Sequence, residues 1–551
     1  MIRASLFTAA LLCSASPALA DTLIDNVQGI AFDENGEIDR FTALLVDDAG
    51  RVQQVLRDGD RRPADPDFMF DGKGQVVLPG LMDSHLHMMD LGFGALTLDL
   101  SDTTSLAEAQ AKIAAYAEEY PGRPWIIGRG WNQVKWGLGR FPTAAELDVA
   151  VEDRPVWLER SDNHAGWGNT AALKAAGITA ATQSPPGGRI ERMAGSNEPS
   201  GVFVDEAYGL VQKIVPAPTP ADRDLALVKA QDTLVAMGVT AAADMGTTIE
   251  DWQALRRAGD AGALRVRTIS YAAGVDAMQL IGGPGPTRWL YGDRLRLNGV
   301  KLYLDGALGS RGAWLKRPYA DDAGNTGLPL QTPTQLRNLM SRAALDDFQL
   351  AIHAIGDAAN GEVLAAIGEL AQTYDGDRRW RIEHAQIVDT ADIAKFGAHG
   401  VIASMQPVHQ TSDRTMAEQR LDAPRLEGAY AWRTIMETGA PLAFGSDAPV
   451  ERPDPFAGLA AAISRTDADG QPFGGWRPGE TVNRTVALRG YTADGAHAAF
   501  ADGKFGKLMP GEWADFIIVD RDPLIASPAD IRKTRVLQTW VAGQQVYIAP
   551  E

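Results

Sequence analysis

The sequence predicts an α/β protein whose centre is a TIM-like (β/α)8 barrel, flanked by a small β-sandwich built from both chain ends. Three observations favour this fold class. Short apolar runs alternate with helical patterns along the middle of the chain, several runs close in His or Asp, and both chain ends read as short strands and turns. A barrel brings the carboxyl ends of its parallel strands to one face, where residues distant in sequence meet.

The first twenty residues are typical of a secretory signal peptide. A single cation, Arg3, precedes the apolar stretch Ala4–Leu12, and Ala18–Ala20 supplies an A-x-A cleavage site before Asp21. The apolar stretch is too short to span a bilayer. We therefore expect residues 1–20 to be removed, leaving a periplasmic or secreted protein without a stable membrane anchor. A buried N-terminal helix is the alternative.

Charge and cysteine content exclude several classes of function. The formal net charge is −19 and no basic run is interleaved with aromatic residues, which argues against nucleic-acid partners and anionic membranes. The single cysteine, Cys13, falls in the predicted signal peptide, so the mature chain is expected to form no disulfide. A metal site in the mature chain must therefore use His, Lys and carboxylates.

The two chain ends have similar sequence patterns. Residues 21–78 and 505–551 consist of short strand-like runs and turns, for example FTALLVDDAGRVQQVL and ADFIIVDRD. Because neither piece is long enough to form a stable sheet alone, we expect them to be parts 1 and 2 of one β-sandwich. The barrel, residues 79–504, would interrupt that sandwich.

Between the ends, eight apolar runs are candidate barrel strands, and helical patterns fill most intervals. The first interval is far longer than an ordinary connection, and we interpret residues 88–236 as an inserted subdomain that covers the pocket. Its glycine-rich phrase WIIGRGWNQVKWG makes Trp131 a candidate substrate-binding wall, with simple packing as the alternative. The eight runs are Val76–Leu81, Val239–Asp244, Arg265–Tyr271, Leu297–Leu302, Gln349–Ile352, Trp380–Glu383, Val401–Met405 and Pro441–Gly445.

Residues with metal-binding chemistry close several of these runs. His85 and His87 follow the first one, and because alternate residues of an extended chain share a face, both imidazoles emerge together with Asp83. Paired imidazoles on a rigid platform suit a divalent metal, usually zinc. Two incidental surface histidines are the alternative. The pattern recurs in His353, His384 and Asp447 at the ends of later runs, with Lys301 inside another.

The order of these residues resembles the amidohydrolase superfamily. The phrases GVKLYLDGALGSRGAW, IHAIGDAANGEVL, RIEHAQ, SMQPVH and AFGSDAPVERPDPFAGL are similar to its YtcJ-like branch, amidohydrolase family 3, which includes N-substituted formamide deformylases. The resemblance runs from about Asp21 to the C-terminus. It implies a metal-dependent hydrolase on a barrel fold and, as a family tendency, a homodimer.

The resemblance also implies a ligand set. His85, His87 and Asp447 would hold one zinc ion, while His353 and His384 would hold a second or remain outer ligands. An ammonium has no lone pair, so Lys301 is expected as an N6-carboxylated lysine that bridges two metals. An ordinary lysine paired with Asp305 or another carboxylate is the alternative. Asp447 would act as the general base as well.

Three further residues receive interpretations. His164 matches a histidine that the family places near the active site, where it would polarise a substrate carbonyl or stabilise an oxyanion. Packing against Trp167 is the alternative for it. Arg311 is predicted to bind substrate, and His409 is interpreted as a surface or core histidine. The stretch GALGSRG lacks the Lys-Ser/Thr ending of a phosphate loop.

Together these features predict an enzyme that cleaves a non-peptide C–N bond in an amide, N-acyl or formamide-type small molecule, using metal-activated water. The nearest alternative is a deaminase or cyclic-amide hydrolase with the same centre. Such deaminases commonly carry a glutamate in an HxxE arrangement, which His353-Ala-Ile-Gly-Asp357 lacks. The alternative from another class is a catalytically silent metal-binding periplasmic protein.

Overall fold

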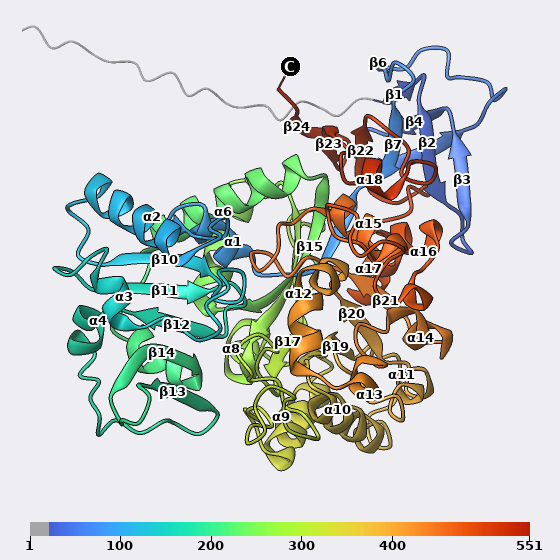
Figure 1. Cartoon of the computed structure of the whole chain (residues 1–551). Helices are drawn as coiled ribbons and strands as arrows, with labels where there is room; N and C mark the ends of the chain where they lie inside the picture. Colours follow the sequence, from blue (N-terminus) through green and yellow to red (C-terminus); the bar gives the residue numbers. More distant parts are fainter. Residues whose placement is uncertain (1–20, 551) are drawn as a thin grey trace, which may run out of the picture.

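The computed structural model describes residues 21–550, and Figure 1 shows three parts. A barrel occupies the centre, a separate blue-green sheet lies to its left, and sheets of blue and red strands lie at the upper right. The predicted signal peptide, residues 1–20, lies outside the described part. Within residues 21–550, no helix has the length and apolar character needed to cross a membrane.

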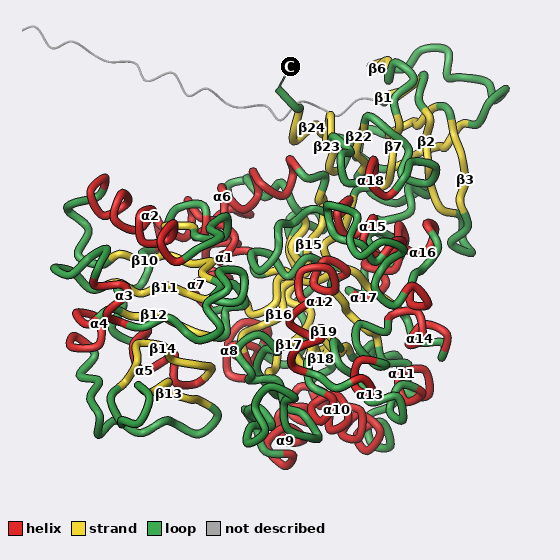
Figure 2. Tube along the Cα trace, in the orientation of Figure 1, coloured by secondary structure: helices red, strands yellow, loops and turns green. Residues whose placement is uncertain are grey.

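Eight parallel strands form the predicted barrel, and Figure 2 shows their yellow segments among red helices. Their hydrogen-bonded order, β21-β20-β19-β18-β17-β16-β15-β8, follows the order of the chain. Sequential parallel strands of this kind need a crossover at each step, which the helices supply. The strands are β8 (Leu81–Leu86), β15 (Val239–Thr247), β16 (Arg267–Ala273), β17 (Leu295–Tyr303), β18 (Gln349–Ala354), β19 (Arg381–His384), β20 (Ile402–Met405) and β21 (Leu442–Phe444).

The first and last strands, β8 and β21, approach each other and nearly close the barrel. Their contact continues past the end of β21, where N of Asp447 donates to O of His85 at 2.7 Å. One step further, N of His87 donates to O of Ala448, again at 2.7 Å. We call this contact the β8–β21 seam. It brings residues that lie more than 300 positions apart into backbone contact.

The predicted first barrel strand, Val76–Leu81, is wrong. Its residues divide between β7 (Val76–Pro79), which belongs to a sheet of the chain ends, and β8, which is the true barrel strand. Both strands are buried, and the apolar run continues from Val76 through Met82 across the change of strand, so hydrophobicity does not mark it. The change of sheet occurs at Gly80, where a Cβ would lie 2.2 Å from Oγ1 of Thr240.

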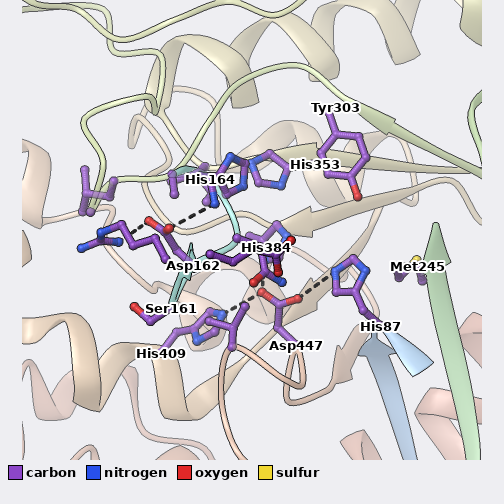
Figure 3. A pocket seen from close by; sticks show the side chains of 18 of the residues that line it. His87, Ser161, Asp162, His164, Met245, Tyr303, His353, His384, His409 and Asp447 are labelled. Atoms are coloured by element: carbon purple, nitrogen blue, oxygen red, sulfur yellow. Dashed lines mark hydrogen bonds and ion pairs between the residues drawn. The ribbon is translucent and has the colours of Figure 1, made fainter. Parts of the chain in front are cut away.

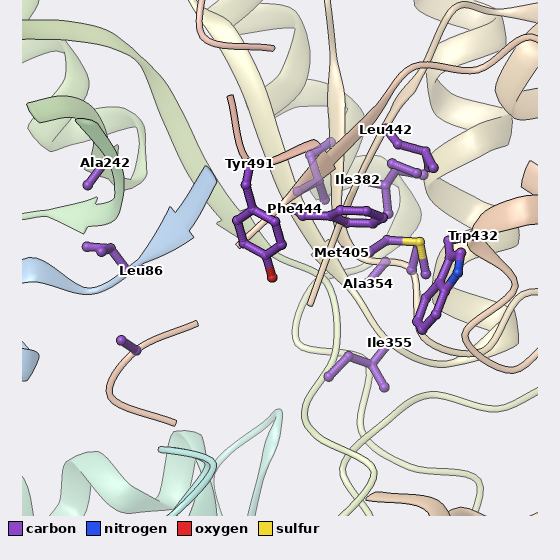
Figure 4. Close-up of a cluster of buried hydrophobic side chains, with 14 of the residues drawn as sticks. Leu86, Ala242, Ala354, Ile355, Ile382, Met405, Trp432, Leu442, Phe444 and Tyr491 are labelled. Atoms are coloured by element: carbon purple, nitrogen blue, oxygen red, sulfur yellow. The ribbon is translucent and has the colours of Figure 1, made fainter. Parts of the chain in front are cut away.

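Apolar side chains fill the layer between the strands and the surrounding helices (Figure 4). Strand residues such as Ile382, Leu442 and Phe444 pack there against Trp432 of α14 (Trp432–Glu437), and all four are buried. Phe444 also contacts Tyr491, with ring centroids 5.7 Å apart. This layer holds the barrel strands in place.

The barrel interior, by contrast, contains buried charged side chains beside a smaller apolar cluster. In β19, Arg381 and Glu383 alternate with Ile382 and face the opposite side of the sheet. The guanidinium of Arg381 donates to O of Ser84 at 2.6 Å and to Oγ of Ser404 at 2.8 Å. Because those two residues lie in β8 and β20, this one buried cation joins three strands below the carboxyl ends.

Local signals explain where the main barrel helices begin. Thr219, Thr248 and Thr332 each form a capping box with the third helical residue, and α6 and α9 also begin with proline. Such caps satisfy amide groups that have no partner within the helix. The helices around the barrel include α6 (Pro220–Ala236), α7 (Ile249–Asp260), α8 (Gly274–Gly282), α9 (Pro333–Leu345), α10 (Asp357–Leu370), α11 (Ala394–Ala398), α12 (Pro407–Arg420), α15 (Pro455–Ser464), α16 (Arg484–Gly490) and α17 (Ala493–Ala498).

The long connection between β8 and β15 contains a separate six-stranded sheet, in the order β13-β14-β12-β11-β10-β9. Helix α1 (Met88–Gly94) and helix α6, at the two ends of this connection, pack on each other within the barrel core. The separate sheet itself therefore spans Leu98–Asp205, inside the predicted limits 88–236. Its elements are β9 (Leu98–Asp99), α2 (Leu106–Glu119), β10 (Ile126–Trp131), α3 (Ala144–Asp148), β11 (Val156–Arg160), β12 (Ala165–Gly168), α4 (Thr170–Ala175), β13 (Gly188–Arg192) and β14 (Pro199–Asp205).

Strands from both chain ends share one six-stranded sheet, β24-β23-β22-β7-β2-β3, beside the four-stranded sheet β5-β4-β1-β6. Ile24 and Val52 from the smaller sheet pack with Val77 and Phe516 from the larger one. The strands are β1 (Thr22–Asp25), β2 (Gln28–Phe32), β3 (Ile38–Phe41), β4 (Ala43–Val46), β5 (Val52–Leu56), β6 (Phe68–Asp71), β22 (Phe516–Val519), β23 (Val536–Val541) and β24 (Gln544–Ile548).

A buried ion pair joins these sheets to the barrel. Nε and Nη2 of Arg267 in β16 bind the two carboxylate oxygens of Asp515 at 2.5 and 2.8 Å. Both side chains are almost fully excluded from solvent. A bidentate pair of this kind fixes orientation as well as distance.

We predict that Asp515→Ala lowers the free energy of unfolding by about 3–5 kcal/mol, because it leaves the Arg267 guanidinium buried without its counter-charge. Chemical denaturation followed by circular dichroism measures the change. Glu437→Ala is the matched control, since it removes an exposed pair with Arg433 and is expected to have little effect. Equal losses in the two variants would contradict this assignment.

Candidate metal centre

The β8–β21 seam places three predicted ligands together. Nε2 of His85 and Nε2 of His87 each lie 3.3 Å from Oδ1 of Asp447. Asp83, expected on the same face as the histidines, instead accepts hydrogen bonds from N (2.9 Å) and Oγ of Ser446. Its carboxylate therefore reinforces the seam.

The other predicted ligands surround this group, as Figure 3 shows for His353, His384 and Asp447. Nδ1 of His384 lies 3.9 Å from Oδ2 of Asp447, and its ring centroid is 4.6 Å from that of His353. Nζ of Lys301 lies 3.3 Å from Nε2 of His85. The six residues predicted as ligands therefore lie at one end of the barrel.

Two of these residues adopt a backbone conformation that is uncommon without glycine. His384 has φ of +77° and Asp447 has φ of +59°. Both stand immediately at or after the end of a strand, where the backbone turns away from the sheet. Backbone strain of this kind tends to occur at functional sites, where neighbouring structure holds it in place.

The donor set fits a divalent cation. Ligand atoms of His85, His384 and Asp447 all lie within 4.8 Å of one another, and the three residues are buried. Among residues 21–550, Oδ1 of Asp447 and Nε2 of His353 are buried without a hydrogen-bond partner. Buried polar atoms in that state are costly unless another group satisfies them. Imidazole nitrogens and carboxylate oxygens are the donors that zinc accepts.

The protonation states of three histidines and of Asp447 agree with this fit, whereas for His87 burial lowers the pKa but the contacts with Asp447 outweigh burial and raise it. Burial lowers the pKa of His85, His353 and His384, which favours neutral imidazoles with free lone pairs. Burial alone would raise the pKa of Asp447, but the electrostatic interaction with the His85 ring and the hydrogen bond from His409 outweigh it and hold the pKa well below its usual range. Asp447 is therefore a carboxylate.

A second layer of side chains orients His85. Its Nδ1 lies 2.6 Å from Oε2 of Glu383, and Arg381 donates to both oxygens of Glu383 at 2.7 and 3.1 Å. Burial would raise the pKa of Glu383, but the Arg381 charge lowers it to about 2. This carboxylate holds the Nδ1 proton of His85 and leaves Nε2 free for a metal. Sequence reasoning missed Glu383, although its position two residues after Arg381 in RIEH indicates an inward side chain.

Lys301 is not paired with Asp305. The Asp305 carboxylate instead accepts backbone amide hydrogens from Trp314, Ile355 and Gly356 at 2.8–3.0 Å. Lys301 is buried next to His85, and burial lowers its pKa to about 8. A substantial fraction of this amine is neutral near pH 8.

His409 is the second residue that sequence reasoning missed. It lies in the first turn of α12, with Nε2 3.2 Å from Oδ2 of Asp447 and Nδ1 3.5 Å from Glu451. Burial lowers its pKa, but hydrogen bonds to Asp447 and Glu451 outweigh burial and raise the pKa to about 10. The available signal was the position of QPVH directly after β20.

A cavity of about 1060 Å³ opens beside the six residues, with walls from the barrel and from the separate sheet. His164 lines this cavity, and its ring centroid lies 5.1 Å from that of His353. Nδ1 of His164 is 2.7 Å from Oδ1 of Asp205. Burial lowers the pKa of His164, but Asp205 outweighs it and the pKa is raised. Trp167, the alternative partner, packs with Trp131 instead.

Two predicted substrate-binding residues lie elsewhere. Trp131 is fully buried in the core of the separate sheet, where its Nε1 donates to O of Leu158 at 2.9 Å. Alternation along β10 turns its ring away from the cavity. Arg311 pairs with the partly exposed Asp321 at 2.8 Å and does not line the cavity. In both cases the polar group of the side chain binds a neighbouring residue outside the cavity, Leu158 for Trp131 and Asp321 for Arg311.

Comparison with known proteins gives consistent results. The family model described as "Amidohydrolase family" matches residues 69–547. "Protein LONG AFTER FAR-RED 3" of Arabidopsis thaliana is 34% identical over 503 residues, covering 87% of this chain and 85% of that protein. The amidohydrolase YtcJ of Bacillus subtilis is 33% identical over 483 residues, covering 86% and 89%. An N-substituted formamide deformylase of Arthrobacter pascens is 27% identical over 520 residues, covering 91% and 94%.

A solved structure agrees with these relatives. An uncharacterized metal-dependent hydrolase from Pyrococcus horikoshii superposes with a TM-score of 0.73 at 26% identity, covering 92% of this chain and 99% of that one. The match confirms the resemblance found in the sequence motifs. Because the family model spans nearly all described residues, this protein belongs to the amidohydrolase family and is a metal-dependent hydrolase of that superfamily.

Proposed function

We propose that this protein hydrolyses a non-peptide C–N bond in a small amide, N-acyl or formamide-type molecule. The position of Asp447 carries the proposal. Its carboxylate contacts His85 and His87 at the inner end of the cavity, so one group can ligate a metal and accept a proton from water. The formamide deformylase relative supports a C–N bond as the target.

Zinc is the proposed metal, because the donors are imidazoles and a carboxylate. When bound, zinc supplies Lewis acidity, which lowers the pKa of water to about 7 and polarises a carbonyl group. His85, His87 and Asp447 would hold one ion, and His353 and His384 would hold a second. Glu383 keeps the Nε2 lone pair of His85 directed at the site.

The chain's own groups then handle the proton. A carboxylate oxygen of Asp447 accepts a proton from the attacking water and returns it to the leaving nitrogen. The hydrogen bond from Nε2 of His409 to Oδ2 fixes the direction of that carboxylate. His164 lies beside His353 in the same cavity, where it would polarise the substrate carbonyl.

We also propose that Lys301 is N6-carboxylated. Its Nζ would add to carbon dioxide, forming an N–C bond and releasing one proton, so that the carbamate oxygens could bridge two metals. Burial next to His85, without a carboxylate partner among residues 21–550, supports this modification.

We predict that chelation abolishes amide hydrolysis and that zinc restores it, because without the metal no Lewis acid activates the water or polarises the carbonyl group. Purified protein is dialysed against a chelator, its metal content is measured, and turnover is tested on formanilide, acetanilide and N-acetylglycine. Magnesium addition is the control, since it prefers oxygen ligands and should restore little activity. Turnover by metal-free protein would refute the proposed chemistry.

We predict that Asp447→Asn lowers kcat by about 10²- to 10⁴-fold, because an amide cannot accept the proton from water. The four histidines should still retain zinc, which elemental analysis measures alongside the rates. The matched control is Asp389→Asn, which alters a surface pair with Lys316. Zinc-loaded wild type without turnover on amides or esters would instead favour a silent metal-binding protein.

We predict that wild-type protein equilibrated with ¹³C-bicarbonate shows a carbamate carbon resonance in its NMR spectrum. Lys301→Met should lack this resonance and bind less zinc, because it loses the bridging oxygens. Lys316→Met is the control, since that lysine is half exposed and paired with two aspartates. Two tightly bound metals in Lys301→Met would argue against a bridging carbamate.

A further inference from the structure

A carboxylate of the separate sheet contacts the cavity histidine across from the metal centre. We propose that Asp205 is a positioning residue that fixes His164 over the six-residue centre, and that the glycine-rich loop 305–312 of the barrel accommodates this carboxylate. The inference rests on the proposed function, because it gives His164 its orientation toward the substrate.

The two residues are joined by side chain and by backbone. Oδ1 of Asp205 lies 2.7 Å from Nδ1 of His164, and N of Asp205 donates to O of His164 at 3.0 Å. His164 directly precedes β12 and Asp205 ends β14, and these two strands pair antiparallel with Ala165 opposite Val204. Rigid sheet register therefore places the carboxylate beside the imidazole.

The backbone conformation at Asp205 favours glycine, which indicates that the carboxylate side chain is needed at this position. The residue has φ of +49° and ψ of −125°, a conformation that strongly favours glycine. Its side chain is nevertheless almost completely buried. A non-glycine residue in this conformation needs compensation from its surroundings, and the hydrogen bond to His164 provides it.

The glycine-rich loop after β17 supplies the space. A Cβ on Gly306 would lie 2.5 Å from Oδ2 of Asp205, and one on Gly312 would lie 2.4 Å from the same atom. A Cβ on Gly309 would lie 2.8 Å from Nη1 of Arg160, another side chain of the separate sheet. The three glycines therefore mark the close approach of the barrel loop to charged groups of that sheet.

Asp205 therefore determines which ring nitrogen of His164 faces the cavity. With Nδ1 donating to the carboxylate, His164 turns Nε2 toward the cavity, where its imidazolium form donates a hydrogen bond to a carbonyl oxygen or oxyanion. The ring centroid stands 5.1 Å from that of His353, so this nitrogen borders the same volume as the metal ligands. Without Asp205, the ring could rotate or change tautomer.

A double-mutant cycle tests the assignment with zinc-loaded full-length protein and formanilide as the probe. His164→Asn and Asp205→Gly should each lower kcat by about 100-fold, with little change in KM. Because glycine adopts the Asp205 backbone conformation freely, that variant removes only the carboxylate. The double variant should be no slower than His164→Asn, since both changes remove one function. Multiplicative losses would overturn the proposal.

Asp205→Asn repeats the cycle with a side chain of the same size, in case the glycine variant is unstable. A smaller loss of kcat that again vanishes in the His164→Asn background supports the proposal, and a loss that persists there overturns it. Glu146→Gln is the matched control in α3, which contacts β12 and β14 of the same sheet, because its carboxylate caps that helix and does not line the cavity. It should leave kcat unchanged.

A readout independent of turnover is the protonation state of His164, observed by NMR in ¹⁵N-histidine-labelled protein and assigned with His164→Asn. Wild type should keep a proton on Nδ1 in addition to the Nε2 proton that the ring donates, and Asp205→Gly should retain only the Nε2 proton. An unchanged protonation state would overturn the positioning role. If wild type hydrolyses no amide but Asp205→Gly still changes the protonation of the His164 ring, the proposed function fails and the Asp205–His164 assignment stands.

Discussion

Closure of the barrel between β8 and β21 is the constraint on which the site depends. Two backbone hydrogen bonds of 2.7 Å, from Asp447 to His85 and from His87 to Ala448, connect strands at opposite ends of the barrel sequence. They bring Nε2 of His85 and Nε2 of His87 each to 3.3 Å from Oδ1 of Asp447. Without this seam, the histidines and the carboxylate would belong to separate edges of an open sheet.

Charge inside the barrel supports the seam. Arg381 and Glu383 form a buried pair below the ligands, and this pair sets the orientation of His85. A buried pair is weak evidence for stability, since desolvation offsets its attraction. Here its visible effect is geometric: it joins β8, β19 and β20 and fixes one imidazole. Fold and metal centre therefore depend on the same interior side chains.

Strand-end chemistry could be predicted from sequence, because His and Asp after apolar runs have a simple geometric meaning in a barrel. The strand change at Gly80 could not, since the apolar run of β7 continues into the first residues of β8 and the two strands belong to different sheets. Trp131 and Arg311 were misplaced for a related reason: a side chain's direction depends on which neighbour is nearer. His409 and Glu383 act through contacts with ligands, and such contacts become visible only in three dimensions.

The most direct measurement is a crystal structure of zinc-loaded protein with anomalous diffraction at the zinc edge. The account predicts an anomalous peak about 2.0–2.2 Å from Nε2 of His85, Nε2 of His87 and an oxygen of Asp447. A peak at any other place, with these three side chains unliganded at full zinc occupancy, would contradict it.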